Sequence, residues 1–448
     1  MKKIAVPLVL VLLAALPAAA QARGALDPSF GAGGRVVRVS PTRAISGPTQ
    51  VVQSPDGTVY ALYRGLLMAF QSNGETDPSF GTDGVVPLLD RIHFGYGPRL
   101  AIDSQGRLVV AGPVNVHDYG YVTPVIAEQL LAVTRLLPDG SPDPGFNGGE
   151  VLFTDLGLPE ASPPPGAPAS VRGGFSLTPT MVDIDASDRI LIAGNRIAAY
   201  DANKNGLIPY SEAIVARLDS GGGIDRSYAG GGVARGFAQY PLSASAAAPD
   251  GSAYVSYRVP VKGGTTVARI VRLSPNGFPG RGFGGAAGVE VTAAGEVEMT
   301  TDGRGRPTIV DPHMTRKGLT ATVTRFRLDG RPATAFGRDG WRNVGFPHAK
   351  TLLVGIAGDR SGGVFLATTV NASGGTVKRF ALAHLNRRGS IDRRFGRPAT
   401  GFGAGTKASL TSLSVDRLGR PLLGGDIVSP QLPGHLGLAM ARYLAPRP

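Results

Sequence analysis

The residues with the clearest capacity for chemistry lie between positions 201 and 212. Asp201, Asn203, Asn205, Gly206 and Glu212 fit the calcium-loop pattern D-x-[DN]-x-[DN]-G-x5-E. In such a loop, oxygen atoms of alternate residues converge on one ion, the glycine permits a sharp turn, and the last carboxylate closes the ligand shell. The sequence therefore predicts a Ca²⁺ site and no other cofactor.

The same residues also suit an ordinary polar hairpin, and the two interpretations stay open. No helix is apparent on either side of the loop, and Glu212 falls where an apolar strand pattern begins. Only Asp201 and Glu212 carry formal charge. We therefore expect weak calcium affinity, with the ion bracing a loop.

Motifs for catalysis are missing from the sequence. It contains no His-Glu-x-x-His pair, no Gly-x-Ser-x-Gly elbow and no phosphate-binding loop, and its 448 residues include no cysteine. Disulfides and thiolate metal sites are thereby excluded. We assign no catalytic residues, although His93 with Asp90, and His348, lie in connections that could approach a shared channel.

A repeated strip of sequence indicates the elements that would position such loops. Leu26-Asp27-Pro28-Ser29-Phe30-Gly31 recurs as Thr76-Asp77-Pro78-Ser79-Phe80-Gly81. Weaker copies bring the number to seven, and they centre on Phe146, Tyr228, Phe283, Phe336 and Phe395. We interpret the Asp, Pro, Phe and Gly of this strip as structural, because they suit a capped turn beside a buried ring.

Each copy is accompanied by an Asp-Gly type hairpin signal and by an alternating strand, as at 56–60 and 131–136. Four short strands per unit at a regular period are typical of propeller blades. The sequence predicts an all-β, seven-bladed β-propeller of four-stranded antiparallel blades over residues 23–448. Because the chain starts with a fourth strand and ends with a third, we expect the N-terminal strand to join the last three strands.

These strips resemble the delta-60 repeat family of secreted bacterial β-propellers. The resemblance covers residues 24–448, although Gly280 and Ala333 stand where the fifth and sixth copies should have Asp. It implies architecture and export, and it implies no reaction.

The first residues have the features of a signal peptide. Lys2 and Lys3 precede an apolar run over 4–20, and Ala20-Gln21-Ala22 forms a small-residue cleavage site. We predict cleavage after Ala22, a secreted or extracytoplasmic protein, and no membrane span in the mature chain. The alternative is a retained N-terminal anchor.

The formal net charge is +13, carried mostly by arginine. This charge would suit an anionic cell-surface polymer, whereas we expect no nucleic-acid partner. Arginines also recur at one position of the third strand, where His384 and Ala69 are the exceptions. We interpret them as packed between blades with their heads paired to carboxylates, the alternative being a ring that binds an anion. The set is Arg135, Arg217, Arg272, Arg325 and Arg442.

The position of the insertions suggests which face is functional. The turns between strands one and two and between strands three and four share one face, whereas the long insertions at 113–129, 155–178, 195–211 and 311–319 fall on the other. Variable loops on a rigid scaffold commonly bind ligands. We predict a binding or scaffold module that holds a protein or glycan through this insertion-bearing face. The alternative is a hydrolase, lyase or dehydrogenase with its site at the mouth of the central channel.

Overall fold

The computed structural model describes the following residues: 24–39, 50–63, 65–88, 97–115, 129–158, 171–201, 210–238, 240–261, 266–280, 282–285, 287–293, 295–372, 377–428 and 436–446. The predicted signal peptide, residues 1–22, lies outside this part of the chain. So do Asn203, Asn205, Asp90 and His93. Within the described part, no helix is long and apolar enough to cross a membrane.

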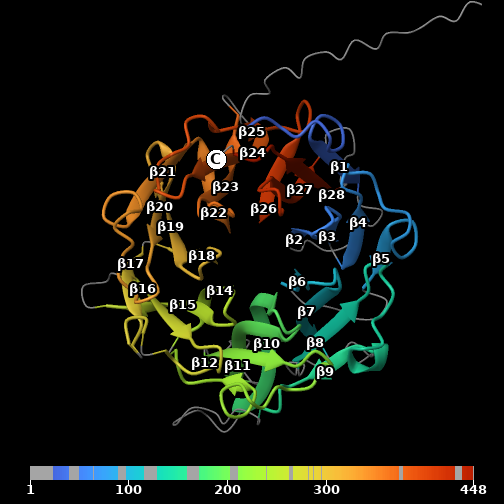
Figure 1. Cartoon of the computed structure of the whole chain (residues 1–448), viewed down its shortest axis with the longest axis vertical. Coiled ribbons are helices and arrows are strands. Elements are labelled where there is room, and N and C mark those ends of the chain that lie inside the picture. Colours follow the sequence, from blue (N-terminus) through green and yellow to red (C-terminus); the bar gives the residue numbers. More distant parts are fainter. Residues whose placement is uncertain are drawn as a thin grey trace, which may run out of the picture.

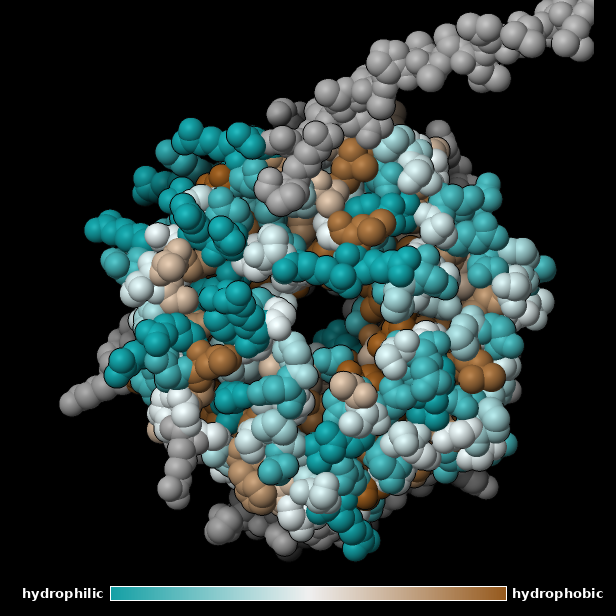
Figure 2. All heavy atoms as spheres, in the orientation of Figure 1, coloured by the Kyte–Doolittle hydropathy of each residue, from teal (hydrophilic) through white to brown (hydrophobic). Residues whose placement is uncertain are grey.

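The described chain is all-β and forms a propeller, with sheets arranged in a ring around a central opening (Figures 1 and 2). Five of its sheets are separate, four-stranded and antiparallel. The only other regular element among the described residues is a three-residue 3-10 turn, η1 (Asn147–Gly149).

The strands of the five separate blades follow one another in sequence. The first blade contains β2 (Gln50–Gln53), β3 (Val59–Tyr63), β4 (Leu66–Phe70) and β5 (Val85–Pro87). The second contains β6 (Arg99–Ile102), β7 (Leu108–Asn115), β8 (Gln129–Leu136) and β9 (Leu152–Thr154). The third contains β10 (Val171–Ile184), β11 (Ile190–Asp201), β12 (Tyr210–Leu218) and β13 (Val233–Ala234). The fourth contains β14 (Leu242–Ala247), β15 (Ala253–Pro260), β16 (Thr266–Leu273) and β17 (Val289–Thr292). The fifth contains β18 (Glu298–Thr301), β19 (Pro307–Thr315), β20 (Gly318–Arg325) and β21 (Trp341–Pro347).

The remaining strands form one eight-stranded sheet, which corrects the predicted count of seven separate blades. One set contains β22 (Ala349–Gly358), β23 (Val364–Asn371), β24 (Lys378–Leu385) and β25 (Ala399–Thr400). The other set contains β26 (Lys407–Val415), β27 (Pro421–Val428), β28 (Leu436–Arg442) and β1 (Arg35–Val39). A single parallel pair, Lys378 with Lys407, joins β24 to β26 and fuses the two sets into one sheet.

The predicted closure of the ring is confirmed. β1 pairs antiparallel with β28 from Arg35 opposite Ala441 to Val39 opposite Gly437, so the first strand completes the set made by the last three. Figure 1 shows the blue β1 beside the red β28. This pairing removes a sheet edge that would otherwise be open.

The hydrophobic core lies between neighbouring blades. The repeated aromatic residue of each strip is buried, with an exposed fraction of 0 or 1 % at all seven positions. Phe146, for example, packs with Ile190 and Ile214 of the following blade. Burying a ring of this size contributes about 1.5–3 kcal/mol, so the strip holds adjacent blades together. Its predicted structural role is confirmed.

Candidate functional site

The predicted calcium ligands are only partly within the described chain. Asp201 ends β11, and Glu212 lies on β12. The Glu212 carboxylate accepts hydrogen bonds from Arg196 at 3.2 Å and from Arg235 at 2.7 Å. Among the described residues, no group of three or more His, Cys, Asp or Glu side chains is placed to hold a metal. The calcium loop stays a prediction.

Three cavities of the described chain lie on the face opposite the predicted insertions. We call this the turn face, defined by the connections from the first to the second strand and from the third to the fourth strand of each blade. Much of the insertion-bearing face, including 116–128, 159–170 and 202–209, lies outside the described residues.

The recurring third-strand arginines lie just inside the turn face. Four of the five pair with a carboxylate as predicted, whereas Arg325 Nε donates to Thr308 Oγ1 and Arg325 is in none of the ion pairs of the described residues. Arg135 Nε donates to Asp143 at 2.6 Å, and Arg442 Nε donates to Asp27 at 2.9 Å. Arg135 Nη1 also reaches the backbone carbonyl of Ser220 in the next blade at 2.6 Å. All five guanidinium groups lie 4.4–5.8 Å from an aromatic ring. Three of these arginines connect neighbouring repeats by donating to a backbone carbonyl of the next one: Arg135 to Ser220, Arg217 to Pro275 and Arg325 to Gly362.

A second Asp-Arg pair occurs around the hairpin between the first two strands, and the sequence analysis missed it. In four of the seven sequence repeats an Asp at the end of the first strand accepts from the Nε of the Arg four residues later, at 2.5–2.8 Å: Asp103 with Arg107, Asp185 with Arg189, Asp302 with Arg306, and Asp416 with Arg420. The spacing Asp-x3-Arg is visible in the sequence.

The other three repeats carry Thr58, Ser252 and Gly363 in place of that arginine. The three cavities lie near these repeats, beside Ser54, Ala248 and Asp359 respectively, with volumes of about 270, 480 and 730 Å³. Neighbouring repeats that keep the hairpin arginine also line them, with Arg420 at the first cavity and Asp185 and Asp302 at the second.

The largest cavity has lost both arginines of the repeat. Gly363 replaces the hairpin arginine, and His384 replaces the third-strand arginine. The two replacements depend on each other, because a Cβ atom at Gly363 would lie 2.4 Å from an Asp359 oxygen and 2.7 Å from Nε2 of His384. A histidine in this position therefore requires glycine at 363.

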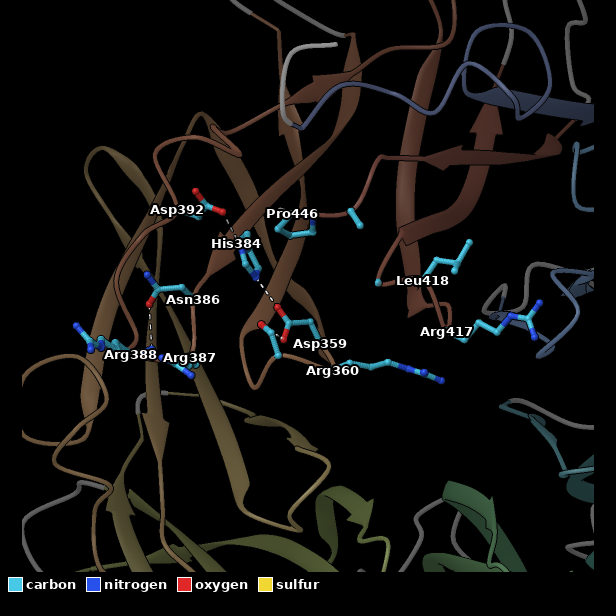
Figure 3. Close-up of a pocket in the computed structure, with 13 residues that line it drawn as sticks. Asp359, Arg360, His384, Asn386, Arg387, Arg388, Asp392, Arg417, Leu418 and Pro446 are labelled. Carbon is cyan, nitrogen blue, oxygen red and sulfur yellow. Dashed lines mark hydrogen bonds and ion pairs between the residues drawn. The ribbon is translucent and has the colours of Figure 1, made fainter. Parts of the chain in front are cut away.

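His384 forms the floor of the cavity and bridges two turns (Figure 3). Its Nε2 lies 2.7 Å from Asp359 and its Nδ1 lies 3.1 Å from Asp392, and the side chain is 2 % exposed. Only a doubly protonated imidazole donates to both carboxylates, since the neutral ring has one N–H. The ring also packs against Phe365, with centroids 4.6 Å apart.

Both carboxylates have pKa values below the usual range. Burial acts to raise the pKa of Asp359, but hydrogen bonds from His384, Ser361 and the Gly363 N–H outweigh it. Burial likewise opposes the shift at Asp392, whose pKa is lowered by bonds from backbone N–H groups and from His384. These two acids are therefore anionic and internally satisfied at neutral pH.

The rim of the cavity is basic on several sides and apolar on one. Arg360, Arg387, Arg388 and Arg417 line it, together with Leu418, Ala445 and Pro446. Leu418 is 61 % exposed. Within the described part of the chain, none of these four arginines lies within ion-pair distance of a carboxylate, in contrast to the paired arginines of the repeat.

Two acids on first strands of the described sheets have raised pKa values, Asp183 on β10 and Glu298 on β18. Glu298 begins β18, an inner strand beside the opening in Figure 1. Burial raises its pKa to about 7, with Arg99 opposing the rise and Glu296 adding to it. His348, proposed from the sequence to approach the channel, is exposed between β21 and β22.

Comparison with known proteins adds likenesses of fold alone. No protein-family model matches the chain, and no curated protein matches it. A structure of a protein of unknown function from Dyadobacter fermentans DSM 18053 has 13% identity and a TM-score of 0.40, covering 90% of this chain and 99% of that one. The polysaccharide lyase Uly1 has 9% identity and a TM-score of 0.46, covering 91% of each chain. The sialidase Hz136 has 11% identity and a TM-score of 0.40, covering 87% of this chain and 74% of that one. At these values the likenesses carry no argument about function.

Proposed function

We propose that this protein is an exported binding or scaffold propeller that holds a protein or glycan ligand on its rigid ring. The observation that carries the proposal is the cavity of about 730 Å³ floored by His384. Ligand sites commonly measure about 300–1,000 Å³ and combine an apolar wall with a few placed polar groups. This cavity has both.

The walls of the His384 cavity come from short turns rather than from long loops. Residues of the β22–β23, β24–β25 and β26–β27 connections line it, and their backbones are held by bonds to Asp359, Asn386 and Asp416. Pre-organised walls reduce the entropy that is lost when a ligand binds. This supports binding at the turn face, in addition to the binding that the sequence predicts for the insertion-bearing face.

We further propose that the eight-stranded sheet acts as two blades, which gives the ring the sevenfold repeat of the sequence. The two halves share one parallel residue pair, whereas each half is built from regular antiparallel ladders. The same proposal includes three features, each of which rests on a sequence pattern. They are membership of the delta-60 repeat family, the signal peptide over 1–22 and the Ca²⁺ loop.

The variant His384→Arg tests binding at the cavity. It restores the residue found in five other blades, so we expect a folded protein whose arginine extends toward the next blade and fills the cavity. On an array of neutral and acidic glycans, the wild type should bind at least one glycan that this variant does not bind. The control Thr58→Arg adds the same charge at another blade and should bind like the wild type. If the two variants bind alike, the cavity is not the binding site.

A propeller hydrolase, lyase or dehydrogenase is the second candidate, and Glu298 is the observation that favours it. A carboxyl with a pKa of about 7 is suited to general acid or base catalysis at neutral pH. Turnover of polysaccharide substrates that is lost in Glu298→Gln, with an inflection near that pKa, would support this candidate.

A further inference from the structure

We propose that the group held in the His384 cavity is the anion of an acidic glycan, a carboxylate or sulfate bound by the rim arginines. This inference rests on the proposed binding function and specifies its ligand. The cavity is the one place described here where several arginines of the turn face surround a hollow without a carboxylate partner.

The two acids in the cavity do not neutralise the rim. Asp359 is engaged by His384, Ser361 and the Gly363 N–H. Asp392 is engaged by His384 and by the backbone N–H groups of Arg394 and Phe395. Four arginine charges on the rim therefore exceed two carboxylate charges that are already satisfied, and the excess favours an anion.

The chemistry of the rim fits a planar or tetrahedral oxyanion. A guanidinium group presents N–H donors in a fork that matches carboxylate and sulfate oxygens. Arg360 comes from the β22–β23 turn, Arg387 and Arg388 from the β24–β25 turn, and Arg417 from the β26–β27 turn. Donors from three separate turns surround a ligand, whereas arginines on one turn would contact it from one side.

The apolar wall favours a glycan over a small inorganic ion. Leu418, Ala445 and Pro446 line the cavity, and Figure 3 shows Leu418 on the opposite side of Asp359 from Arg387 and Arg388. A sugar ring has an apolar C–H face that packs on such a wall while its acid group reaches the arginines. The proposed cleavage after Ala22 removes Lys2 and Lys3 and leaves a formal net charge of +11 out of +13, which adds a long-range attraction for an acidic polymer.

Calorimetry with defined glycans tests the inference. The probes are oligogalacturonate for carboxylates, heparin oligosaccharides for sulfates, and neutral dextran oligomers as the control. We expect at least one acidic probe to bind and dextran not to bind. Affinity should fall as NaCl is raised from about 0.05 to 0.5 M, because screening weakens exposed charge pairs. Heparin binding without oligogalacturonate binding would support the anion site and identify its source as sulfate.

Matched variants locate the binding. The double variant Arg387→Ser with Arg388→Ser should weaken the acidic probe by about tenfold or more, since it removes charge-assisted hydrogen bonds. Arg331→Ser removes an exposed arginine from the turn of another blade and should leave affinity unchanged. Equal losses in both would overturn the inference in favour of diffuse attraction to a basic surface.

Failure of the inference is distinguishable from failure of the proposed function. If dextran binds as tightly as the acidic probes and His384→Arg abolishes that binding, the cavity is a binding site but not an anion site. If His384→Arg leaves acidic-probe binding intact, the anion is bound elsewhere and the inference is wrong.

Discussion

Two replacements in the set of β22 to β25 accompany a cavity. In several other repeats, arginines fill the space between the first hairpin and the third strand and pair with aspartates, whereas the repeat of β2 to β5 carries Thr58 and Ala69 and lacks both arginines. In the blade of β22 to β25, Gly363 and His384 take their places, and the imidazole holds both aspartates. This set of strands therefore keeps hydrogen bonds to both aspartates, but Gly363 and His384 occupy less volume than two arginines would.

Gly363 should be intolerant of any side chain. An added Cβ would meet Asp359 and His384 and would lie 2.6 Å from the carbonyl oxygen of Leu385, which cannot move without distorting β24. We expect Gly363→Ala to lower the free energy of unfolding by about 1–3 kcal/mol, as overpacking does in other cores. Urea titration followed by circular dichroism measures the change.

The matched control is Gly345→Ala on β21, where an added Cβ has no neighbour within 4 Å. This substitution should change stability by about 0.5 kcal/mol or less, because it meets open space. Equal effects at the two sites would show that the His384 arrangement does not depend on glycine at 363.

The sequence made part of this arrangement predictable. The third-strand arginines and the buried aromatic residues were identified from their recurrence, and His384 was recognised as an exception. The hairpin arginines are harder to predict, because they occur in four repeats only and Thr58, Ser252 and Gly363 interrupt the pattern. The cavity depends on how neighbouring blades pack, which spacing along one chain does not reveal.

Closure of the ring depends on a side-chain clamp as well as on strand pairing. Asp27, which precedes β1, accepts hydrogen bonds from Arg442 at 2.9 Å and from Arg420 at 3.0 Å. Asp27 and Arg442 are only 3 % and 1 % exposed. The clamp therefore ties the start of the described chain to its last two long strands.

Asp27→Ala should lower the free energy of unfolding by about 3–5 kcal/mol, because it leaves a buried arginine without its counter-ion. Asp77→Ala is the control at the equivalent position of the next repeat, where Ala69 replaces the arginine and the Asp77 carboxylate bonds only to Ser79 among the described residues. That change should cost about 1 kcal/mol. Chemical unfolding measures the free energy of unfolding of both variants. A smaller loss for Asp27→Ala than for Asp77→Ala would argue against the clamp.

The loop after β11 makes a prediction of its own. If it binds Ca²⁺ only in the folded state, about 1 mM calcium should raise the melting temperature. Asp201→Ala should abolish the rise, and Asp329→Ala, an exposed turn residue elsewhere, should retain it. No rise in the wild type, or a rise that survives Asp201→Ala, would end the calcium hypothesis.

The assembled ring should be sensitive to acid. Asp27, Asp143, Asp225, Asp302 and Asp359 all have lowered pKa values, because hydrogen bonds and the charge of a neighbouring arginine, or of His384 in the case of Asp359, outweigh burial. Their stabilisation is complete above the unfolded carboxyl pKa of about 4 and is lost as pH falls through the lower folded values. We expect the melting temperature not to fall from pH 7 to 5, where protonation of Glu298 adds stability, and to fall steeply below 4. A constant melting temperature down to pH 2.5 would contradict this.

Repetition made the propeller and its closure predictable, because strand number and order follow from copies along the chain. The fusion of the last two sets of strands was not predictable. It depends on one contact, Lys378 with Lys407, between strands that the repeat treats as independent. The position of the cavity on the turn face was also not predictable. Insertions are visible as extra residues in the sequence, whereas the smaller side chains of Gly363 and His384 show their effect only where neighbouring repeats pack.

Hydrogen exchange in the presence and absence of a bound acidic glycan tests the central claim most directly. Binding at the His384 cavity predicts slower exchange in the turns at 359–363, 386–392 and 416–419, with the rest of the described ring unchanged. Protection confined to the insertion-bearing face, with these three turns unaffected, would contradict it.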